Sequence, residues 1–129
     1  MNNLKLLKAA EKHGSPLYAY DTNKIKKQYN RLKNSFKTVK SLQINYAVKA
    51  LSNISILKFI INLGSGIDAV SIQEVYLALK CGIRPEKIIY TPNGVSMDEI
   101  KMAADLGVKI NIDNLSCLLY TSPSPRDRG

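Results

Sequence analysis

Apolar and polar positions along this chain follow a pattern that predicts helices and short strands in alternation. From about residue 22, an amphipathic helix is followed by a glycine or a polar turn, a short apolar strand and the next helix. Four helices are expected, at about residues 22–36, 53–63, 71–81 and 96–106. Four strands are expected between and after them, at residues 43–48, 67–70, 88–90 and 108–112.

The predicted helices have recognisable ends. Glycine, which readily adopts the left-handed conformation that closes a helix, follows three of them, at Gly64, Gly82 and Gly107. Two helices are preceded by a serine with a glutamate three residues later, the spacing of a capping box: Ser71 with Glu74, and Ser96 with Glu99. These signals agree in register with the apolar pattern and support the alternation.

Short strands that are separated by single helices predict a parallel sheet, because each helix must return the chain to the same end of the sheet. An open doubly wound sheet and a barrel both satisfy this pattern. Neither GxGxxG nor GxxxxGK[ST] follows the first strand, which disfavours the open sheet. We therefore expect an α/β fold, the first half of a (β/α)8 TIM-type barrel with parallel strands. Because such a barrel has eight units, we expect a truncated chain.

The two ends of the chain differ from this alternation. Residues 1–21 are expected to form a lysine-rich helix ending near His13 and a strand at Pro16–Asp21, in a different layer from the barrel. Residues 22–116 are expected to form the partial barrel. Residues 117–129 carry Pro123 and Pro125 where a helix is due, and resemble a translated library adapter, so we expect a non-native tail.

The net charge of +9 raises the alternative of a nucleic-acid-binding module. Most of this charge lies in the first 49 residues, and residues 24–40 contain seven basic side chains and no acid. Apolar side chains recur at helical spacing in the same segment, at Ile25, Tyr29, Leu32 and Phe36. This spacing predicts that the aromatics lie on a buried stripe and the lysines on a solvated face. We therefore prefer the solvated helix face to the nucleic-acid site.

Cysteine use and hydropathy exclude several classes of protein. Cys81 and Cys117 lie far apart without CxxC spacing or a histidine cluster, so we expect no metal site and no disulfide framework. The longest apolar run, residues 54–63, is interrupted by polar residues, and the first residues are too weakly apolar for a secretory signal. We expect a cytoplasmic protein that does not bind a membrane.

Lys49 is the first candidate for chemistry. Alternation along the strand at residues 43–48 places Tyr46 and Val48 on the face under the helices, and Ala47 and Lys49 on the face toward the barrel interior. The carboxyl ends of the strands form the reaction face of parallel α/β proteins. A lysine at this position can serve as an amine nucleophile, although many lysines at strand ends are simply solvated.

The segment Tyr46–Ala50 (YAVKA) resembles the lysine motif of the barrel-fold pyridoxal-phosphate decarboxylases, which include diaminopimelate, ornithine and arginine decarboxylases. Three further blocks resemble the family in the same order: Pro16–Asp21 (PLYAYD), Gly66–Ser71 (GIDAVS) with Glu74, and Lys87–Gly94 (KIIYTPNG). The last two, with Asn111–Ser116, are closer to the diaminopimelate enzymes. The sequence departs from the family at Ser71–Glu74, where many relatives have two glycines, and at Tyr90–Gly94.

The resemblance implies an alanine racemase-like barrel in which Lys49 binds pyridoxal phosphate covalently and Asp68 helps to orient that lysine. The alternative for Asp68 is a loop or helix-cap aspartate. The implied substrate is a small amino acid, meso-2,6-diaminopimelate, which is decarboxylated to L-lysine by a homodimer. The family's phosphate loop, ring-nitrogen carboxylate, substrate-binding residues and dimer-contributed cysteine do not occur here, so we expect activity of the full-length protein only. The alternatives are an ornithine- or arginine-type decarboxylase, a racemase relative or silent cofactor carrier, and an inactive half barrel.

Overall fold

The computed structural model describes residues 3–112. They form two compact units that divide between Lys40 and Ser41, and each unit is described by itself. A domain boundary at residue 21 stays a prediction, and the expected non-native tail lies outside the described residues. Within those residues, no helix is both long and apolar enough to cross a membrane.

The first unit contains two helices, α1 (Asn3–His13) and α2 (Thr22–Ser35). Asp21 begins α2, because its side-chain oxygen accepts hydrogen bonds from the backbone N–H groups of Asn23 (3.0 Å) and Lys24 (3.2 Å). The strand expected at Pro16–Asp21 is not formed in the described part of the chain, where no neighbouring strand pairs with this segment.

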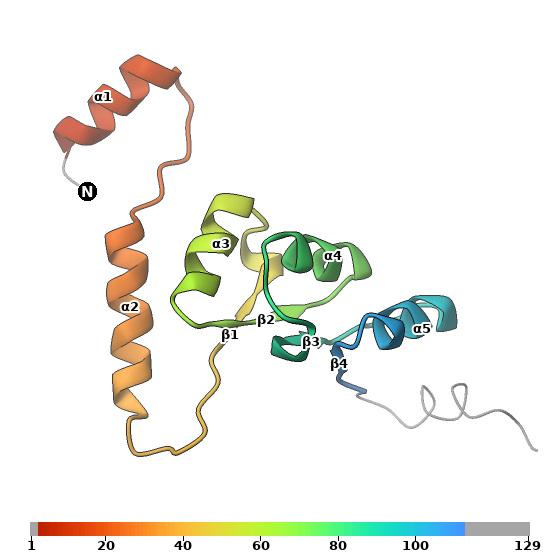
Figure 1. Cartoon of the computed structure of the whole chain (residues 1–129). Coiled ribbons are helices and arrows are strands. Elements are labelled where there is room, and N and C mark those ends of the chain that lie inside the picture. The colour runs from red at the N-terminus through yellow and green to blue at the C-terminus, as the bar shows by residue number, and fades with distance from the viewer. Residues whose placement is uncertain (1–2, 113–129) are drawn as a thin grey trace, which may run out of the picture. The chain divides into compact units, whose positions relative to one another are not determined.

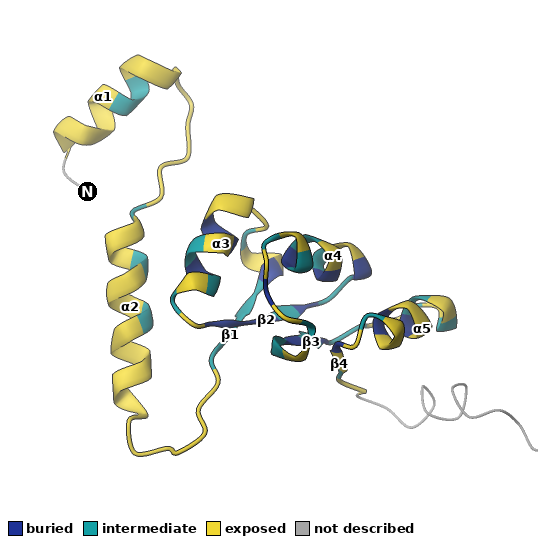
Figure 2. Ribbon diagram, viewed as in Figure 1, coloured by how far each residue is buried: buried dark blue, intermediate teal, exposed yellow. Residues whose placement is uncertain are grey.

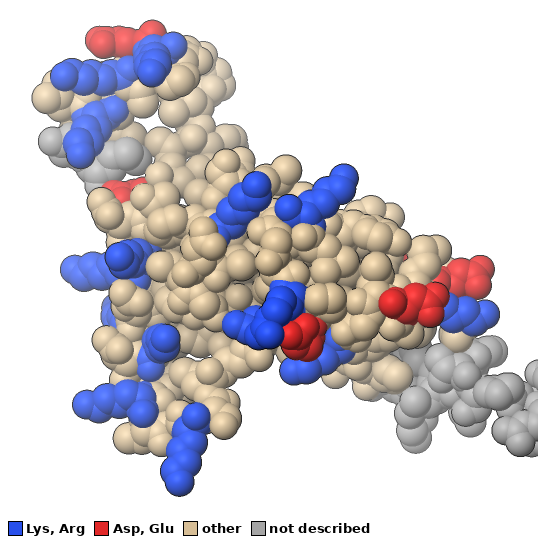
Figure 3. All heavy atoms as spheres, viewed as in Figure 1, with Lys and Arg blue, Asp and Glu red and all other residues tan. Residues whose placement is uncertain are grey.

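The apolar stripe of α2 is also less covered than the sequence predicts. Ile25 and Tyr29 are half-buried, whereas Leu32 and Phe36 are each 46% exposed, and no residue of α2 is buried. The expectation of a buried aromatic stripe is wrong for this unit, because helix α1 and the connecting segments do not bury it. On the face that Figure 3 shows, basic side chains project singly along α2, as expected of a solvated helix face.

The second unit is a parallel sheet of four strands in the order β1-β2-β3-β4 (Figure 1). Its strands are β1 (Asn45–Ala47), β2 (Gly66–Ala69), β3 (Ile88–Tyr90) and β4 (Lys109–Ile110). Its helices are α3 (Ile54–Asn62), α4 (Ile72–Lys80) and α5 (Met97–Asp105), with short 3-10 turns η1 (Val48–Ala50) and η2 (Pro85–Lys87). Every neighbouring pair of strands is parallel, which confirms the prediction from the sequence.

One face of this sheet packs against the helices and forms the core (Figure 2). Paired positions carry side chains on the same face, so that Ile67 lies beside Ile88, and Ala69 beside Tyr90. All four are fully buried, together with Leu57 and Val75 from the covering helices. The other members of this core include Val48, Ile72, Ala78, Ile83, Ala103 and Val108. Within the described part of this unit, the opposite face carries the polar side chains Asn45 and Asp68 and is open.

The helix boundaries agree closely with the expected signals. The three glycines that follow α3, α4 and α5 have φ angles of 98°, 89° and 72°, at Gly64, Gly82 and Gly107 respectively. Ser96 and Glu99 form the complete capping box. The second expected box is only half formed: the Ser71 hydroxyl accepts from the Glu74 N–H (3.3 Å), but the Glu74 carboxylate accepts from the Val70 N–H (2.8 Å).

Tyr90 contributes to the core through its ring. Its hydroxyl is buried and has no hydrogen-bond partner among residues 3–112. Burial raises the pKa of Tyr90 above its ordinary value, and the negative charge of Glu99 raises it further. The phenol therefore stays protonated at neutral pH and lies on the helix side of the sheet, away from the open face.

Gly66 allows β1 and β2 to approach closely at the amino end of the sheet. A Cβ atom at this position would clash with Asn45 Oδ1 and Gln43 Nε2, which are hydrogen-bonded to each other (2.8 Å), and would lie 2.8 Å from the Lys87 carbonyl oxygen. Side chains can move aside, but the backbone carbonyl cannot do so without disturbing β3. We expect Gly66→Ala to destabilise this unit by about 1–3 kcal/mol.

Hydrogen exchange of the β1 to β3 amides in the full-length protein measures this effect. Gly94→Ala is a suitable control, because open space surrounds Gly94 and only its positive φ of 66° opposes a side chain. That control should cost about 1 kcal/mol. A smaller loss of protection for Gly66→Ala than for Gly94→Ala would contradict the steric explanation.

Candidate cofactor-binding site

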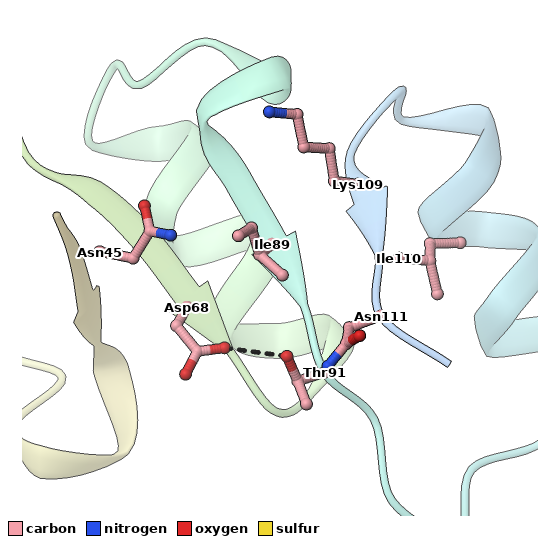
Figure 4. Close-up of a pocket in the computed structure, with 7 residues that line it drawn as sticks. All are labelled: Asn45, Asp68, Ile89, Thr91, Lys109, Ile110 and Asn111. Atoms are coloured by element: carbon pink, nitrogen blue, oxygen red, sulfur yellow. Dashed lines mark hydrogen bonds between the residues drawn. The ribbon is translucent and has the colours of Figure 1, made fainter. Parts of the chain in front are cut away.

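The open face of the sheet carries a hollow of about 480 Å³ (Figure 4). The side chains on this face come from successive strands, because the paired row Ala47, Asp68, Ile89 and Lys109 crosses the whole sheet. The residues that line the hollow are Asn45, Asp68, Ile89, Thr91, Lys109, Ile110 and Asn111. The volume of the hollow lies in the range of small-molecule sites, and its lining combines polar and apolar side chains.

Polar side chains gather at the carboxyl ends of the strands. Asp68, Thr91 and Asn111 lie together at this end of the hollow in Figure 4. The ladder continues beyond the ends of β3 and β4, because the Thr91 N–H donates to the Ala69 carbonyl (2.8 Å) and the Asn111 N–H donates to the Tyr90 carbonyl (2.8 Å). Backbone hydrogen bonds thus hold this polar edge in place.

Asp68 is half-buried within β2. It pairs in register with Ala47 of β1 and Ile89 of β3, and its Oδ1 accepts a hydrogen bond from the Thr91 hydroxyl (3.0 Å). The alternative of a loop or helix-cap aspartate does not describe this residue, because strands flank it on both sides. Asp68 presents a carboxylate to the open face, next to the strand that leads to Lys49.

Lys49 lies directly after β1, at the carboxyl end of the sheet, as predicted from the sequence. The strand ends at Ala47, however, and Lys49 is exposed on the 3-10 turn η1, so strand alternation does not set the direction of its side chain. It is not among the residues that line the hollow. The structure therefore brings Asp68, Thr91 and Asn111 together at the hollow. Lys49 lies on the turn that follows β1, and β1 pairs with β2, the strand that carries Asp68.

The turn that carries Lys49 is held at both ends. Val48 is fully buried, and its carbonyl accepts a hydrogen bond from the Leu51 N–H (3.0 Å). The hydroxyl of Tyr46 donates to the Leu51 carbonyl (3.3 Å), so it spans the turn from the strand to its far side. Two residues of the YAVKA segment thus anchor the backbone on either side of the lysine.

Thr91 and Asn111 are functional candidates that the sequence did not identify. The signal for Thr91 was alternation: Ile89 faces the hollow, and two residues later Thr91 faces the same way. No sequence pattern predicts that the side chains of Asp68 and Thr91, 23 residues apart, form a hydrogen bond. That pairing depends on the register between β2 and β3.

Cys81 is not activated as a nucleophile. It is a free, partly buried cysteine at the end of α4, with its Sγ atom 4.0 Å from the Ile54 carbonyl oxygen. Burial raises the pKa of the Cys81 thiol, and the positive charge of Lys58 opposes that shift only in part. The thiol therefore stays protonated at neutral pH.

Comparison with known proteins identifies the family. The family model for the pyridoxal binding domain of the pyridoxal-dependent decarboxylases matches residues 22–121 of this chain. The chain belongs to this family. The family is that of the pyridoxal-dependent decarboxylases, which confirms the expected cofactor, and the expected first half of a parallel α/β barrel is confirmed by the fold of its members.

Individual relatives in the pyridoxal-dependent decarboxylase family agree with this result. Diaminopimelate decarboxylase of Methanothermobacter thermautotrophicus is 44% identical over 114 residues, which cover 88% of this chain and 27% of that protein. The structure of diaminopimelate decarboxylase from Methanocaldococcus jannaschii in co-complex with L-lysine matches with a TM-score of 0.81 and 33% identity, over 88% of this chain and 28% of that one.

A lysine/ornithine decarboxylase of Vibrio vulnificus, complexed with putrescine, matches with a TM-score of 0.80 and 26% identity, over 90% of this chain and 31% of that one. The present chain thus spans between a quarter and a third of the length of these relatives.

The side chains at the carboxyl edge suit pyridoxal phosphate chemically. An aldehyde cofactor needs a primary amine, and Lys49 carries one on a solvent-exposed turn. Asn111 offers an amide to the cofactor's polar substituents, and the Asp68 carboxylate, which accepts a hydrogen bond from Thr91, can attract a protonated amine. The donor set at this edge is therefore consistent with the family's cofactor.

Proposed function

We propose that the full-length protein decarboxylates meso-2,6-diaminopimelate to L-lysine, with Lys49 as the residue that holds pyridoxal phosphate. The observation that carries this proposal is the lysine of the YAVKA segment at the carboxyl end of β1, in a chain 44% identical to a diaminopimelate decarboxylase. Parallel α/β proteins assemble their reactive groups at the carboxyl ends of the strands.

Lys49 and Asp68 have separate tasks in this proposal. Pyridoxal phosphate, when bound, supplies a conjugated ring that accepts the electron pair left behind as CO₂ departs. Lys49 offers a flexible primary amine that can become neutral and bond to an aldehyde, which an arginine cannot do. Asp68, from the neighbouring strand, offers a carboxylate that attracts the protonated amine and so restricts its position.

An ornithine- or arginine-type decarboxylase is the second candidate. It is supported by the TM-score of 0.80 to the lysine/ornithine decarboxylase of Vibrio vulnificus. The identity of 26% to that protein is lower than the 44% to the diaminopimelate enzyme, and we prefer the diaminopimelate substrate for this reason. We further propose a cytoplasmic homodimer, as the family resemblance implies, and sedimentation of the full-length protein tests the dimer.

Covalent trapping tests the role of Lys49. The full-length protein is incubated with pyridoxal phosphate, reduced with borohydride, digested and mapped by mass spectrometry. We expect the phosphopyridoxyl group on Lys49, and not on the exposed lysines Lys58 and Lys80. Label on another lysine, or no label, would contradict the proposal.

Release of CO₂ tests the substrate. The full-length protein is assayed with meso-diaminopimelate, L-ornithine and L-arginine at equal concentrations, and we expect the highest kcat/KM with diaminopimelate. A higher value with ornithine or arginine would replace the diaminopimelate proposal by the second candidate.

A further inference from the structure

Thr91 connects two strands through its side chain. Its hydroxyl is 3.0 Å from Asp68 Oδ1 and donates a hydrogen bond to it, as the dashed line in Figure 4 shows. The backbone of Thr91 is also attached to β2, because its N–H donates to the Ala69 carbonyl (2.8 Å). Thr91 is thus held at its backbone and reaches the carboxylate of the adjoining strand.

This arrangement restricts the rotation of the Asp68 carboxylate. A carboxylate within a strand can otherwise turn about its terminal bond, because that torsion has a broad energy profile. Threonine is β-branched and has a stiff first side-chain torsion, so its hydroxyl is a well-placed donor. With Oδ1 bound to Thr91, Oδ2 remains to accept a hydrogen bond from another group at the open face.

We propose that Thr91 is a positioning residue, which orients the Asp68 carboxylate toward the amine of Lys49 and the bound cofactor. The inference rests on the proposed function, since it assumes that the cofactor occupies the hollow. It assigns Thr91 no contact with substrate. Its effect passes through the Asp68 carboxylate.

A double-mutant cycle on cofactor affinity tests whether the effect of Thr91 passes through Asp68. The dissociation constant for pyridoxal phosphate is measured by absorbance with the full-length apo-protein and the variants Thr91→Val, Asp68→Ala and the double variant. Valine keeps the shape of threonine and the N–H to the Ala69 carbonyl, but has no hydroxyl. We expect Thr91→Val to weaken binding about tenfold in the natural background, the effect typical of a lost hydrogen bond to a charged group.

In the Asp68→Ala background, Thr91→Val should change the dissociation constant by less than about twofold, because its partner is already gone. A loss of similar size in both backgrounds, or no loss in either, would overturn the inference. Thr91→Ser keeps the hydroxyl and should bind within about twofold of the natural protein. Binding by Thr91→Ser as weak as that of Thr91→Val would also overturn it.

Two further measurements keep the inference separate from the proposed function. Thr38→Val makes the same chemical change at an exposed position in the first unit and should leave the dissociation constant unchanged. Borohydride labelling of the natural protein reports whether Lys49 holds the cofactor. Label on Lys49 together with an unaffected Thr91→Val variant would defeat the positioning role alone, whereas label elsewhere would defeat the proposed function.

Discussion

Lys49→Ala is expected to lower decarboxylation by the full-length protein by about three orders of magnitude or more, because it removes the amine that holds the cofactor in place. Lys49→Arg should fail to the same extent, although it keeps the positive charge. A guanidinium remains protonated and cannot form the bond to an aldehyde that a neutral amine forms. Release of CO₂ from meso-diaminopimelate measures activity, and the absorbance of bound cofactor measures the loss of attachment.

Lys58→Ala is the matched control for both variants. Lys58 is an exposed lysine on α3, and its removal should leave activity and absorbance unchanged. Circular dichroism of all three variants checks that they remain folded. Activity of Lys49→Arg within about tenfold of the natural protein would be incompatible with covalent attachment at this residue.

Leu57→Ala should produce the largest loss of stability in the second unit, about 3 kcal/mol. Leu57 is 0% exposed and packs against the buried face of the sheet, so truncation removes apolar contacts and leaves a cavity. Hydrogen exchange of the β1 and β2 amides in the full-length protein measures the loss locally.

Ile54→Ala on the same helix supplies the comparison, because Ile54 is 50% exposed and leaves no enclosed cavity. We expect it to cost less than about 1 kcal/mol. Equal losses of protection for Leu57→Ala and Ile54→Ala would show that the two positions are not distinguished by burial, contrary to the packing described above.

The regular parts of the second unit could be predicted from the sequence because local and long-range signals agree there. The strand at Ile88–Tyr90 was predicted with its observed bounds, and the glycines after α3, α4 and α5 end the helices as expected. Apolar periodicity predicted the helices α3, α4 and α5, although Ile54, at a position expected to be apolar and covered, is 50% exposed. Parallel pairing followed from chain connectivity alone.

The details that the sequence did not predict depend on neighbours rather than on local pattern. β1 is shorter than expected because the chain enters a 3-10 turn at Val48, and Glu74 binds the Val70 N–H instead of completing a capping box. The apolar stripe on α2 has the right spacing, but spacing does not say what covers a helix. At the candidate site, Lys49 and Asp68 were identified through the family motif, whereas the hydrogen bond from Thr91 to Asp68 needs the strand register.

The hydrogen bond from the Tyr46 hydroxyl to the Leu51 carbonyl restricts the number of residues that the segment around Lys49 can have. In a 3-10 turn each residue rotates the chain by about 120°, so one inserted or deleted residue would swing the lysine to a different side of the turn. The same change would separate the Tyr46 hydroxyl from the Leu51 carbonyl. Point substitutions beside Lys49 should therefore be tolerated more readily than any insertion or deletion between these two residues.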